Sequence, residues 1–260
     1  MSNFQLRSLV GLLLVIITLS NIYLGGIYFT AFCFIIGGFI FYEWLAITQV
    51  LKDKQEFILS LCLYLLVVTS FYFSNYVFAV IFFCFLLLLI YGFVNSRYWS
   101  AFGLLYAALP MVSLALLRVG SDGNIYLILY LFLVVWASDI GGYIFGKAIG
   151  GKKLAPYLSP NKTISGSIGS FLFSVIIAIL FSYFYCNSLY LNLIWLAVIL
   201  SFFVQVGDIG ESAIKRYFRV KDSSNLLPGH GGFMDRFDGL IVAALILYLL
   251  KISFPNFSPL

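Results

Sequence analysis

The chain has 260 residues, of which 63% are hydrophobic and 10% are charged, and its mean hydropathy is +1.06. Soluble domains are about 45–50% apolar and about 25% charged. The composition excludes a water-soluble globule, a disordered chain and a nucleic-acid-binding arm, because so small a protein could not hide this much apolar surface from water. We therefore expect an all-α, polytopic membrane protein that has no nucleic-acid partner.

Three long stretches without any charged residue define the expected helices. They contain 35, 40 and 45 residues and cover positions 8–42, 57–96 and 163–207. One helical crossing needs about 20 residues, so each stretch predicts two helices joined by a short turn. The expected turns are Gly25-Gly26, Ser74-Asn75 and Asn187-Ser188. Single spans are expected at 98–117, 125–145 and 239–254. The prediction is about nine transmembrane helices.

The basic residues predict the orientation. If the N-terminus is cytoplasmic, thirteen of the 15 Lys and Arg residues face the cytoplasm, and only Arg118 and Lys251 do not. Such a bias sets the topology of membrane proteins. The first apolar stretch continues past Ser20 without a small-residue cleavage site, so we interpret it as an uncleaved span. The expected location is the cell membrane (plasma or inner membrane), with the active site facing the cytoplasm.

The chain divides into two functional parts. Residues 1–123 predict generic transmembrane helices, whereas residues 124–260 contain two polar loops and the chemically suggestive sequence, and predict a catalytic transmembrane region. The four cysteines form no C-x-x-C pair, so the sequence supports neither a zinc site nor a disulfide framework.

Asp139 is the first charged residue of the first polar stretch, residues 136–170. An ionised carboxylate inside an apolar span costs at least about 2.5–3.5 kcal/mol, so it indicates either a polar site or a structural pairing with another helix. Gly142, Gly146 and Gly150 recur every four residues, and we expect them to let helices approach closely. A P-loop is excluded, because Ala148 follows Lys147 where a hydroxyl is needed. The hydroxyl- and Gly-rich loop that follows offers N–H groups and positive charge to a phosphate. Its candidate residues are Lys162, Thr163 and Ser165.

The second polar stretch, residues 207–240, contains two phased acidic faces. On a helix, Asp208, Glu211, Ser212 and Lys215 share one face. Asp235 and Asp238 would share another at the start of the last span, and the intervening Gly-rich segment, 228–232, predicts a tight loop. A set of oxygen ligands suits Mg²⁺, which usually binds one or two carboxylates together with substrate phosphates. An ion-paired, solvated loop is the alternative interpretation.

Basic residues surround these carboxylates: Lys215, Arg216, Arg219, Lys221 and Arg236. Acids for a metal and bases for phosphates are typical of phosphoryl or nucleotidyl transfer. His230 could serve as a general base or as a hydrogen-bonding group beside a phosphate. No base is needed if a phosphate monoester attacks, because its second pKa is about 6.

These residues carry a family resemblance. Ser212-Ala-Ile-Lys215-Arg216, Lys221-Asp222, Leu227-Pro228-Gly229-His230-Gly231-Gly232 and Asp235-Arg236-Phe237-Asp238 resemble the signature of phosphatidate cytidylyltransferases (CDP-diacylglycerol synthases). Earlier blocks of that family resemble Asp139 with Tyr143 and Gly146, and Ser159-Pro160 with Lys162-Thr163 and Gly166. The matching motifs cover roughly residues 136–240.

The resemblance implies a magnesium-dependent membrane nucleotidyltransferase of phospholipid biosynthesis, which condenses CTP with phosphatidate to give CDP-diacylglycerol and pyrophosphate. It implies a catalytic set of Asp208, Lys215, His230, Asp235 and Arg236. The expected metal-site residues are Asp139, Asp208, Ser212, Asp235 and Asp238. The expected substrate-binding residues are Lys162, Thr163, Ser165, Arg216, Lys221 and Asp222.

Two other functions stay open at this point. A transporter or lipid flippase also uses intramembrane acids, although inverted repeats are not evident here. A membrane kinase or cytidylyltransferase acting on a polyprenyl lipid is the second. The sequence also leaves open whether the chain works as a monomer or as a homodimer.

Overall fold

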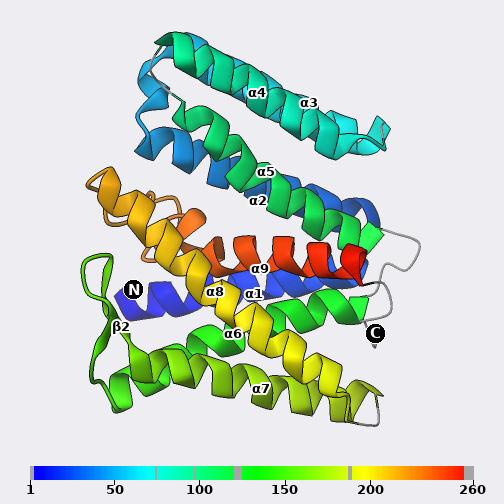
Figure 1. The fold of residues 1–260 in the computed structure, drawn as a ribbon, viewed down its shortest axis with the longest axis vertical. Helices are drawn as coiled ribbons and strands as arrows, with labels where there is room; N and C mark the ends of the chain where they lie inside the picture. Colours follow the sequence, from blue (N-terminus) through cyan, green and yellow to red (C-terminus); the bar gives the residue numbers. More distant parts are fainter. Residues whose placement is uncertain (1–2, 74, 96–97, 120–124, 187–188, 255–260) are drawn as a thin grey trace. The chain divides into compact units, whose positions relative to one another are not determined.

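The structure, a computed structural model, describes residues 3–73, 75–95, 98–119, 125–186 and 189–254 (Figure 1). These residues form nine α-helices, a short 3-10 helix and one β-hairpin. The elements are α1 (Asn3–Leu24), α2 (Gly26–Ile47), η1 (Val50–Lys52), α3 (Lys54–Phe73), α4 (Val77–Asn95), α5 (Trp99–Val119), α6 (Ile125–Ala148), β1 (Lys153–Ala155), β2 (Ser159–Thr163), α7 (Ile164–Cys186), α8 (Leu191–Tyr217) and α9 (Met234–Ser253).

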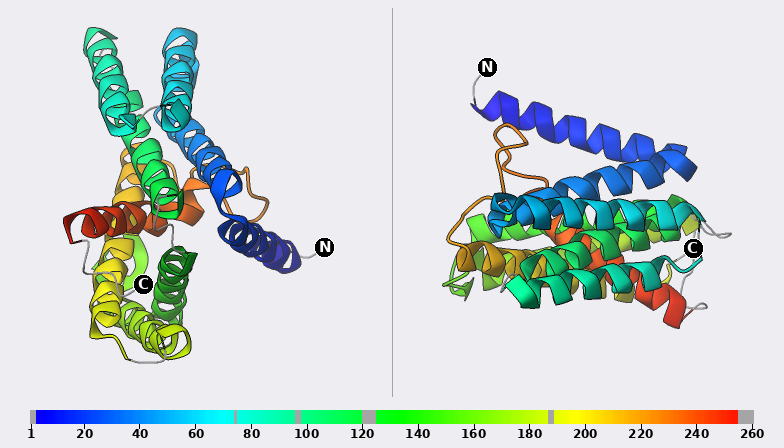
Figure 2. Two further views of the ribbon diagram at one scale, coloured as in Figure 1. Left: turned by 90° about the vertical axis from the view of Figure 1, so that its right-hand side faces the viewer. Right: turned by 90° about the horizontal axis from the view of Figure 1, so that it is seen from above.

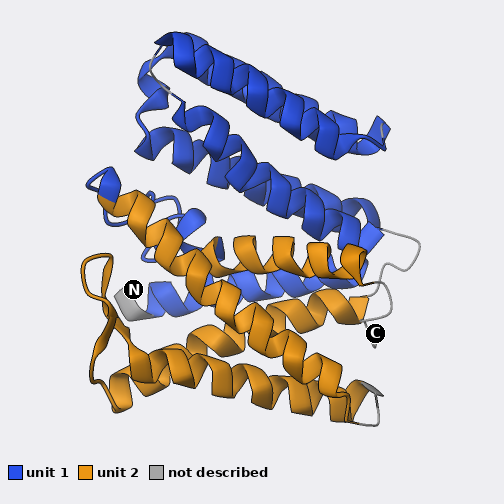
Figure 3. Cartoon of the chain, in the orientation of Figure 1, with its two compact units in different colours: residues 1–119, 217–237 blue, residues 120–216, 238–260 orange. Residues whose placement is uncertain are grey.

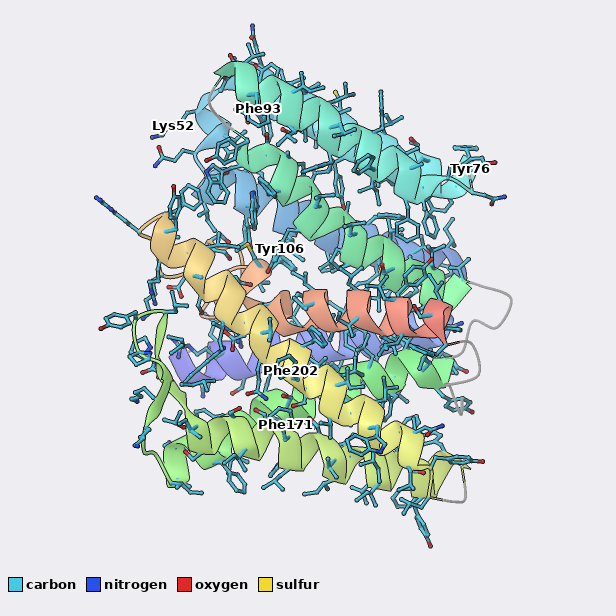
Figure 4. All side chains as sticks on the ribbon, in the orientation of Figure 1. Lys52, Tyr76, Phe93, Tyr106, Phe171 and Phe202 are labelled. Carbon is cyan, nitrogen blue, oxygen red and sulfur yellow. The ribbon has the colours of Figure 1, made fainter. Side chains whose placement is uncertain are left out.

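Eight of the helices, α1 to α8, are long and apolar enough to cross a bilayer. Large apolar side chains such as Phe93 of α4 project outward from them, and Tyr76 projects from the turn before α4 (Figure 4). The expected ninth span, α9, carries four charged residues in 20 and is not one of the eight. The predicted all-α, polytopic membrane architecture is confirmed, and the cytoplasmic position of the N-terminus stays a prediction.

The predicted turns can be compared with the helix ends. Gly25 separates α1 from α2, as expected for the Gly25-Gly26 turn. Asn75 lies in the turn between α3 and α4, whereas Ser74 lies outside the described residues. Residues 187–188 also lie outside them, although α7 ends and α8 begins on either side of this expected turn.

The chain forms two compact units (Figure 3). The first boundary follows residue 119, the second falls inside α8 after residue 216, and the third falls inside α9 after residue 237. Unit 1 contains Met1–Val119 and Tyr217–Phe237, and unit 2 contains Gly120–Arg216 and Asp238–Leu260. The end of α8, the α8–α9 loop (residues 218–233) and the first turn of α9 thus belong with the N-terminal helices. The functional division at residue 123 stays a prediction.

Unit 1 is built around α2 and α5, whose buried faces pack on each other. Gly103 of α5 lies against the indole ring of Trp44, and Trp44 Nε1 donates a hydrogen bond of 2.8 Å to the Trp99 carbonyl. In the right-hand view of Figure 2, the α8–α9 loop (orange) lies beside the N-terminal half of α1 (blue). Segments more than 200 residues apart in sequence therefore meet in this unit.

Unit 2 contains a close pair of helices, α6 and α7. A Cβ atom at Gly141 would lie 2.4 Å from the Gly169 carbonyl oxygen, so only glycine permits this approach. The predicted helix contacts are confirmed for Gly142, which faces Ser170, and for Gly146, whose added Cβ would lie 3.7 Å from the Gly166 Cα. The prediction is wrong for Gly150, because this residue follows the end of α6 with a φ of +64° and a Cβ added to it would meet no other atom within 4 Å.

A β-hairpin, β1–β2, joins α6 to α7, and the sequence analysis does not predict it. Its antiparallel strands pair Lys153 with Thr163 and Ala155 with Ser159. The hairpin places Lys162 next to the start of α7.

Candidate active site

The site residues predicted from the sequence are divided between the two units. Unit 2 contains Asp139, Lys162, Thr163, Ser165, Asp208, Ser212, Lys215, Arg216 and Asp238. Unit 1 contains Lys221, Asp222, His230, Asp235 and Arg236. The expected metal-site residues Asp208 and Asp235 belong to different units, and their common role stays a prediction.

In unit 2, the end of α8 has the polar face that its spacing predicts. α8 runs without interruption to Tyr217, so Asp208, Glu211 and Lys215 do share a face. Glu211 is buried. Its Oε1 lies 2.7 Å from Lys215 Nζ, which donates a hydrogen bond to it and forms an ion pair with it. A buried carboxylate is stable here because this ammonium group compensates its charge.

α8 and α9 cross closely within unit 2. A Cβ atom at Gly207 would lie 2.7 Å from the Asp238 carbonyl oxygen, and one at Gly239 would lie 2.7 Å from Val204. The crossing brings Asp208 and Glu211 of α8 close enough to Asp238 of α9 to act on it electrostatically, and Asp139 of α6 does so as well.

Lys162 extends this cluster from the β-hairpin by forming an ion pair with Asp208. Its side chain is 22% exposed and that of Asp208 is 36% exposed, so the pair is accessible from outside. We define the acid–lysine cluster as Asp139, Lys162, Asp208, Glu211, Lys215 and Asp238. Flexible ammonium groups held beside carboxylates can bind the phosphates of a nucleotide.

A seam of polar side chains holds α8 against α6 and α7, and sequence analysis missed it. Ser138 and Ser201 share a hydrogen bond of 3.0 Å, and Ser170 donates one of 2.8 Å to the Ser138 carbonyl. Ser167 donates a hydrogen bond to Gln205, one turn before Asp208. Amide and hydroxyl groups inside uncharged spans were the available signal, because such groups must find partners in lipid.

Thr163 and Ser165 have structural contacts in unit 2. Buried Thr163 caps α7, because its Oγ1 accepts a hydrogen bond of 3.1 Å from the Gly166 N–H. Ser165 donates to the Gly150 carbonyl and thereby ties the start of α7 to the end of α6. A substrate-binding role for either hydroxyl stays a prediction.

In unit 1, Asp235 organises the α8–α9 loop. Its Oδ2 accepts hydrogen bonds from the Ser223 and Gly232 N–H groups, both 2.8 Å long, and it lies 2.9 Å from Ser223 Oγ, whose single proton it shares with Glu43. Leu227 and Gly231 bridge the loop across Pro228, as expected for a tight turn. The role of Asp235 as a metal ligand stays a prediction.

Glu43 of α2 holds the same loop, and sequence analysis missed this residue. Its side chain is fully buried and accepts hydrogen bonds from Ser223, Ser224, Phe233 and Met234. A lone glutamate near the end of an apolar span was the available signal. The sequence could not show which distant segment Glu43 contacts.

His230 lies at the tip of the loop, against α1. A Cβ atom at Gly11 would lie 3.5 Å from its Nε2, and Arg7 packs on the neighbouring Gly229. Burial and the nearby Arg236 and Arg7 lower the pKa of His230 below its usual value of 6.5, so the imidazole is neutral at pH 7. Arg236 also donates a hydrogen bond of 3.1 Å to the His230 carbonyl.

The other predicted site residues lie on the surface of their units. Lys221 and Asp222 are exposed on the α8–α9 loop. On α8, Arg216 is exposed and Ser212 is partly exposed. Their roles toward substrate or metal stay predictions.

Unit 1 also contains an apolar groove of about 550 Å³ between α1 and α2. Leu13 and Ile17 line it from α1, and Phe32 lines it from α2. Leu227 and Phe233 of the α8–α9 loop complete the lining, so the groove adjoins the segment that carries His230. Its size and chemistry suit a hydrocarbon chain.

A magnesium ion fits the donor chemistry of the acid–lysine cluster, because carboxylate oxygens are hard ligands that repel one another without a cation. Within the described part of the chain, no three acidic, histidine or cysteine side chains converge enough to enclose an ion by themselves. Mg²⁺ usually takes one or two carboxylates and completes its shell with water and phosphates, so an ion at this cluster would need further ligands from the substrates.

Comparison with known proteins gives consistent matches. The profile of a family described as "Cytidylyltransferase family" matches residues 5–254. Proteins named phosphatidate cytidylyltransferase from Brucella suis and Brucella abortus are each 40% identical over 260 residues, which covers 98% of this chain and 95% of theirs. A protein of the same name from Staphylococcus haemolyticus is 45% identical over 163 residues, or 59% of this chain and 62% of its own.

Proposed function

The chain belongs to the cytidylyltransferase family, and from this premise we propose that it condenses CTP with phosphatidate. The products are CDP-diacylglycerol and pyrophosphate. The observation that carries the proposal is the acid–lysine cluster, in which Lys162 and Lys215 stand beside Asp208 and Glu211 at the end of a membrane helix. Two anionic substrates require cations to approach each other. Lys162 and Lys215 provide two, and the four carboxylates of the cluster suit a divalent cation beside them.

The reaction is a direct displacement. An oxygen of the phosphatidate phosphate forms a bond to the α-phosphorus of CTP, while the bond from that phosphorus to the bridging oxygen breaks and pyrophosphate leaves with the electron pair. The attacking oxygen is already ionised at pH 7, since the second pKa of a phosphate monoester is about 6. Lys162 and Lys215 of unit 2 bind and orient phosphates there, and in unit 1 a neutral His230 can donate a hydrogen bond to a phosphate.

We propose that the reaction requires Mg²⁺, held by Asp208 and Asp238 with Asp139 nearby. When bound, the ion neutralises phosphate charge and polarises the reacting phosphoryl group. Asp235 and Ser212 are further candidate ligands.

The apolar groove of unit 1 is proposed to hold an acyl chain of phosphatidate. Leu227 and Phe233 line the groove and flank His230 in sequence. A chain lying in the groove would thus have its phosphate near His230, Arg7 and Arg236, which suits an anion.

The proposed location is the cell membrane, with the active site facing the cytoplasm, where CTP is available. The lipid substrate then never leaves the bilayer. The expectation that no nucleic acid takes part stays a prediction, as does the choice between a monomer and a homodimer.

The test is incorporation of radiolabelled CTP into lipid by the purified protein, with and without Mg²⁺. We expect label in CDP-diacylglycerol only when phosphatidate and Mg²⁺ are both present. Parallel reactions use ATP instead of CTP, and a polyprenyl phosphate instead of phosphatidate. Labelling that prefers either replacement would contradict the substrate assignment, and no nucleotide turnover would favour a transporter.

A further inference from the structure

Glu43 is buried in α2 and binds residues on both sides of the tip of the α8–α9 loop in unit 1. Its Oε2 accepts hydrogen bonds from Ser223 Oγ at 2.8 Å and from the Met234 N–H at 2.7 Å. Its Oε1 accepts from Ser224 Oγ at 2.6 Å and from the Phe233 N–H at 2.9 Å. One side chain therefore closes the loop at its base.

These four bonds satisfy the carboxylate of Glu43. A carboxylate has about four acceptor sites, and a buried one is costly unless they are occupied. Glutamine could not replace it at equal stability, because its amide NH₂ group would face two donors instead of accepting from them. The negative charge therefore matches this loop conformation specifically.

Ser223 connects Glu43 to Asp235. The Ser223 hydroxyl lies 2.8 Å from Glu43 Oε2 and 2.9 Å from Asp235 Oδ2, and the Ser223 N–H donates to Asp235 at 2.8 Å. A displacement of the loop at Glu43 would therefore move Asp235, and it would also move His230 at the loop tip.

We propose that Glu43 is a positioning residue for the reaction and that it acts through the α8–α9 loop without touching the substrates. This inference rests on the proposed function. Glu43 lies in the N-terminal half of the chain, yet it fixes the segment that carries His230, Asp235 and Arg236. Displacing reacting groups by about 1 Å can cost on the order of 100-fold in rate, so loss of this anchor should lower kcat.

The test compares Glu43→Gln with Glu56→Gln in the purified full chain. Glu56 is also a fully buried glutamate, but it lies in the first turn of α3, which packs mainly on α4, α5 and η1 and touches α2 only slightly. The measurements are kcat and KM for both substrates, and amide hydrogen exchange of peptides covering residues 223–234. Ser224→Ala, which removes a single donor from Glu43, provides a milder variant if Glu43→Gln does not fold.

We expect Glu43→Gln to lower kcat on the order of 100-fold, with smaller changes in either KM. The amides of Phe233 and Met234 should exchange faster, while α2 and α5 keep their protection. Ser224→Ala should show the same pattern to a smaller degree, and Glu56→Gln should show neither change.

Three results would overturn the inference. They are a kcat within about two-fold of wild type for Glu43→Gln, a lower kcat with unchanged loop exchange, or equal losses in Glu56→Gln. If Glu43→Gln does not fold, wild-type kcat in Ser224→Ala has the same meaning. If the wild-type protein makes no CDP-diacylglycerol, the proposed function fails instead, and hydrogen exchange still reports whether Glu43 holds the loop.

Discussion

A Cβ atom at Gly232 would lie 2.5 Å from each carboxylate oxygen of Glu43. The same atom would lie 1.9 Å from Ser223 Oγ. Gly232 is therefore required, because the backbone passes so close to the carboxylate that the Cβ atom of any other residue would clash with it. This close approach explains why the last residue of the Gly-rich segment 228–232 is a glycine.

Gly232→Ala should displace the loop from Glu43 and lower both stability and kcat. Overpacking of this kind costs about 1–3 kcal/mol. Gly38→Ala in α2 is the matched control, because its added Cβ would lie 3.6 Å from Tyr64, an ordinary contact. Thermal unfolding and turnover test both variants. Equal unfolding temperatures and turnover rates in the two variants would contradict this prediction, because they would show that the loop accommodates a side chain at Gly232.

Replacing either cluster lysine should impair phosphate binding. We expect Lys215→Ala and Lys162→Ala to lower kcat/KM by about 10²–10³-fold, the range for removing a donor to a developing charge. Lys147→Ala is the control, because Lys147 is exposed and lies over the Tyr143 ring. Steady-state kinetics with CTP varied would detect the difference. Unchanged kinetics for Lys215→Ala would remove this lysine from the site.

A bulky residue in the apolar groove should affect the lipid substrate alone. Leu13→Trp would fill part of the space between α1 and α2, so we expect a higher KM for phosphatidate and an unchanged KM for CTP. Leu12→Trp is the matched control, because Leu12 is 58% exposed and does not line the groove. Equal KM values for phosphatidate in both variants would exclude the groove as the acyl-chain site.

The pH profile should have an acidic limb that does not depend on His230. The pKa of His230 lies below 6.5, so the imidazole is neutral through and above neutral pH. Phosphatidate loses its ionised attacking oxygen as the pH falls through about 6. His230→Gln should therefore lower activity but keep the same limb. Loss of that limb in the variant, measured as kcat/KM against pH, would indicate proton transfer by His230.

Much of the fold follows from the sequence alone. Hydropathy locates the helices because lipid forces each span to satisfy its own backbone. The 3.6-residue period of a helix likewise suffices to place Asp208, Glu211 and Lys215 on one face of α8. Such features depend only on residues close together in the chain, so local rules predict them.

Contacts between distant segments do not follow from local rules. The partners of Glu43 lie about 180 residues away in sequence, and nothing near Glu43 indicates them. The tightest contact between α6 and α7 uses Gly141 and Gly169, although the four-residue spacing pointed to Gly142 and Gly146. The groove between α1 and α2 depends on the α8–α9 loop, whose position only the folded chain defines.

Lipid labelling from radiolabelled CTP by purified Asp208→Asn, compared with wild type and with Asp235→Asn, tests the assigned reaction centre most directly. We expect both variants to insert and fold but to make no CDP-diacylglycerol, whereas the wild type makes it with Mg²⁺ and stops when the ion is chelated. Near-normal synthesis by Asp208→Asn would contradict the assignment of the acid–lysine cluster as the centre of the reaction.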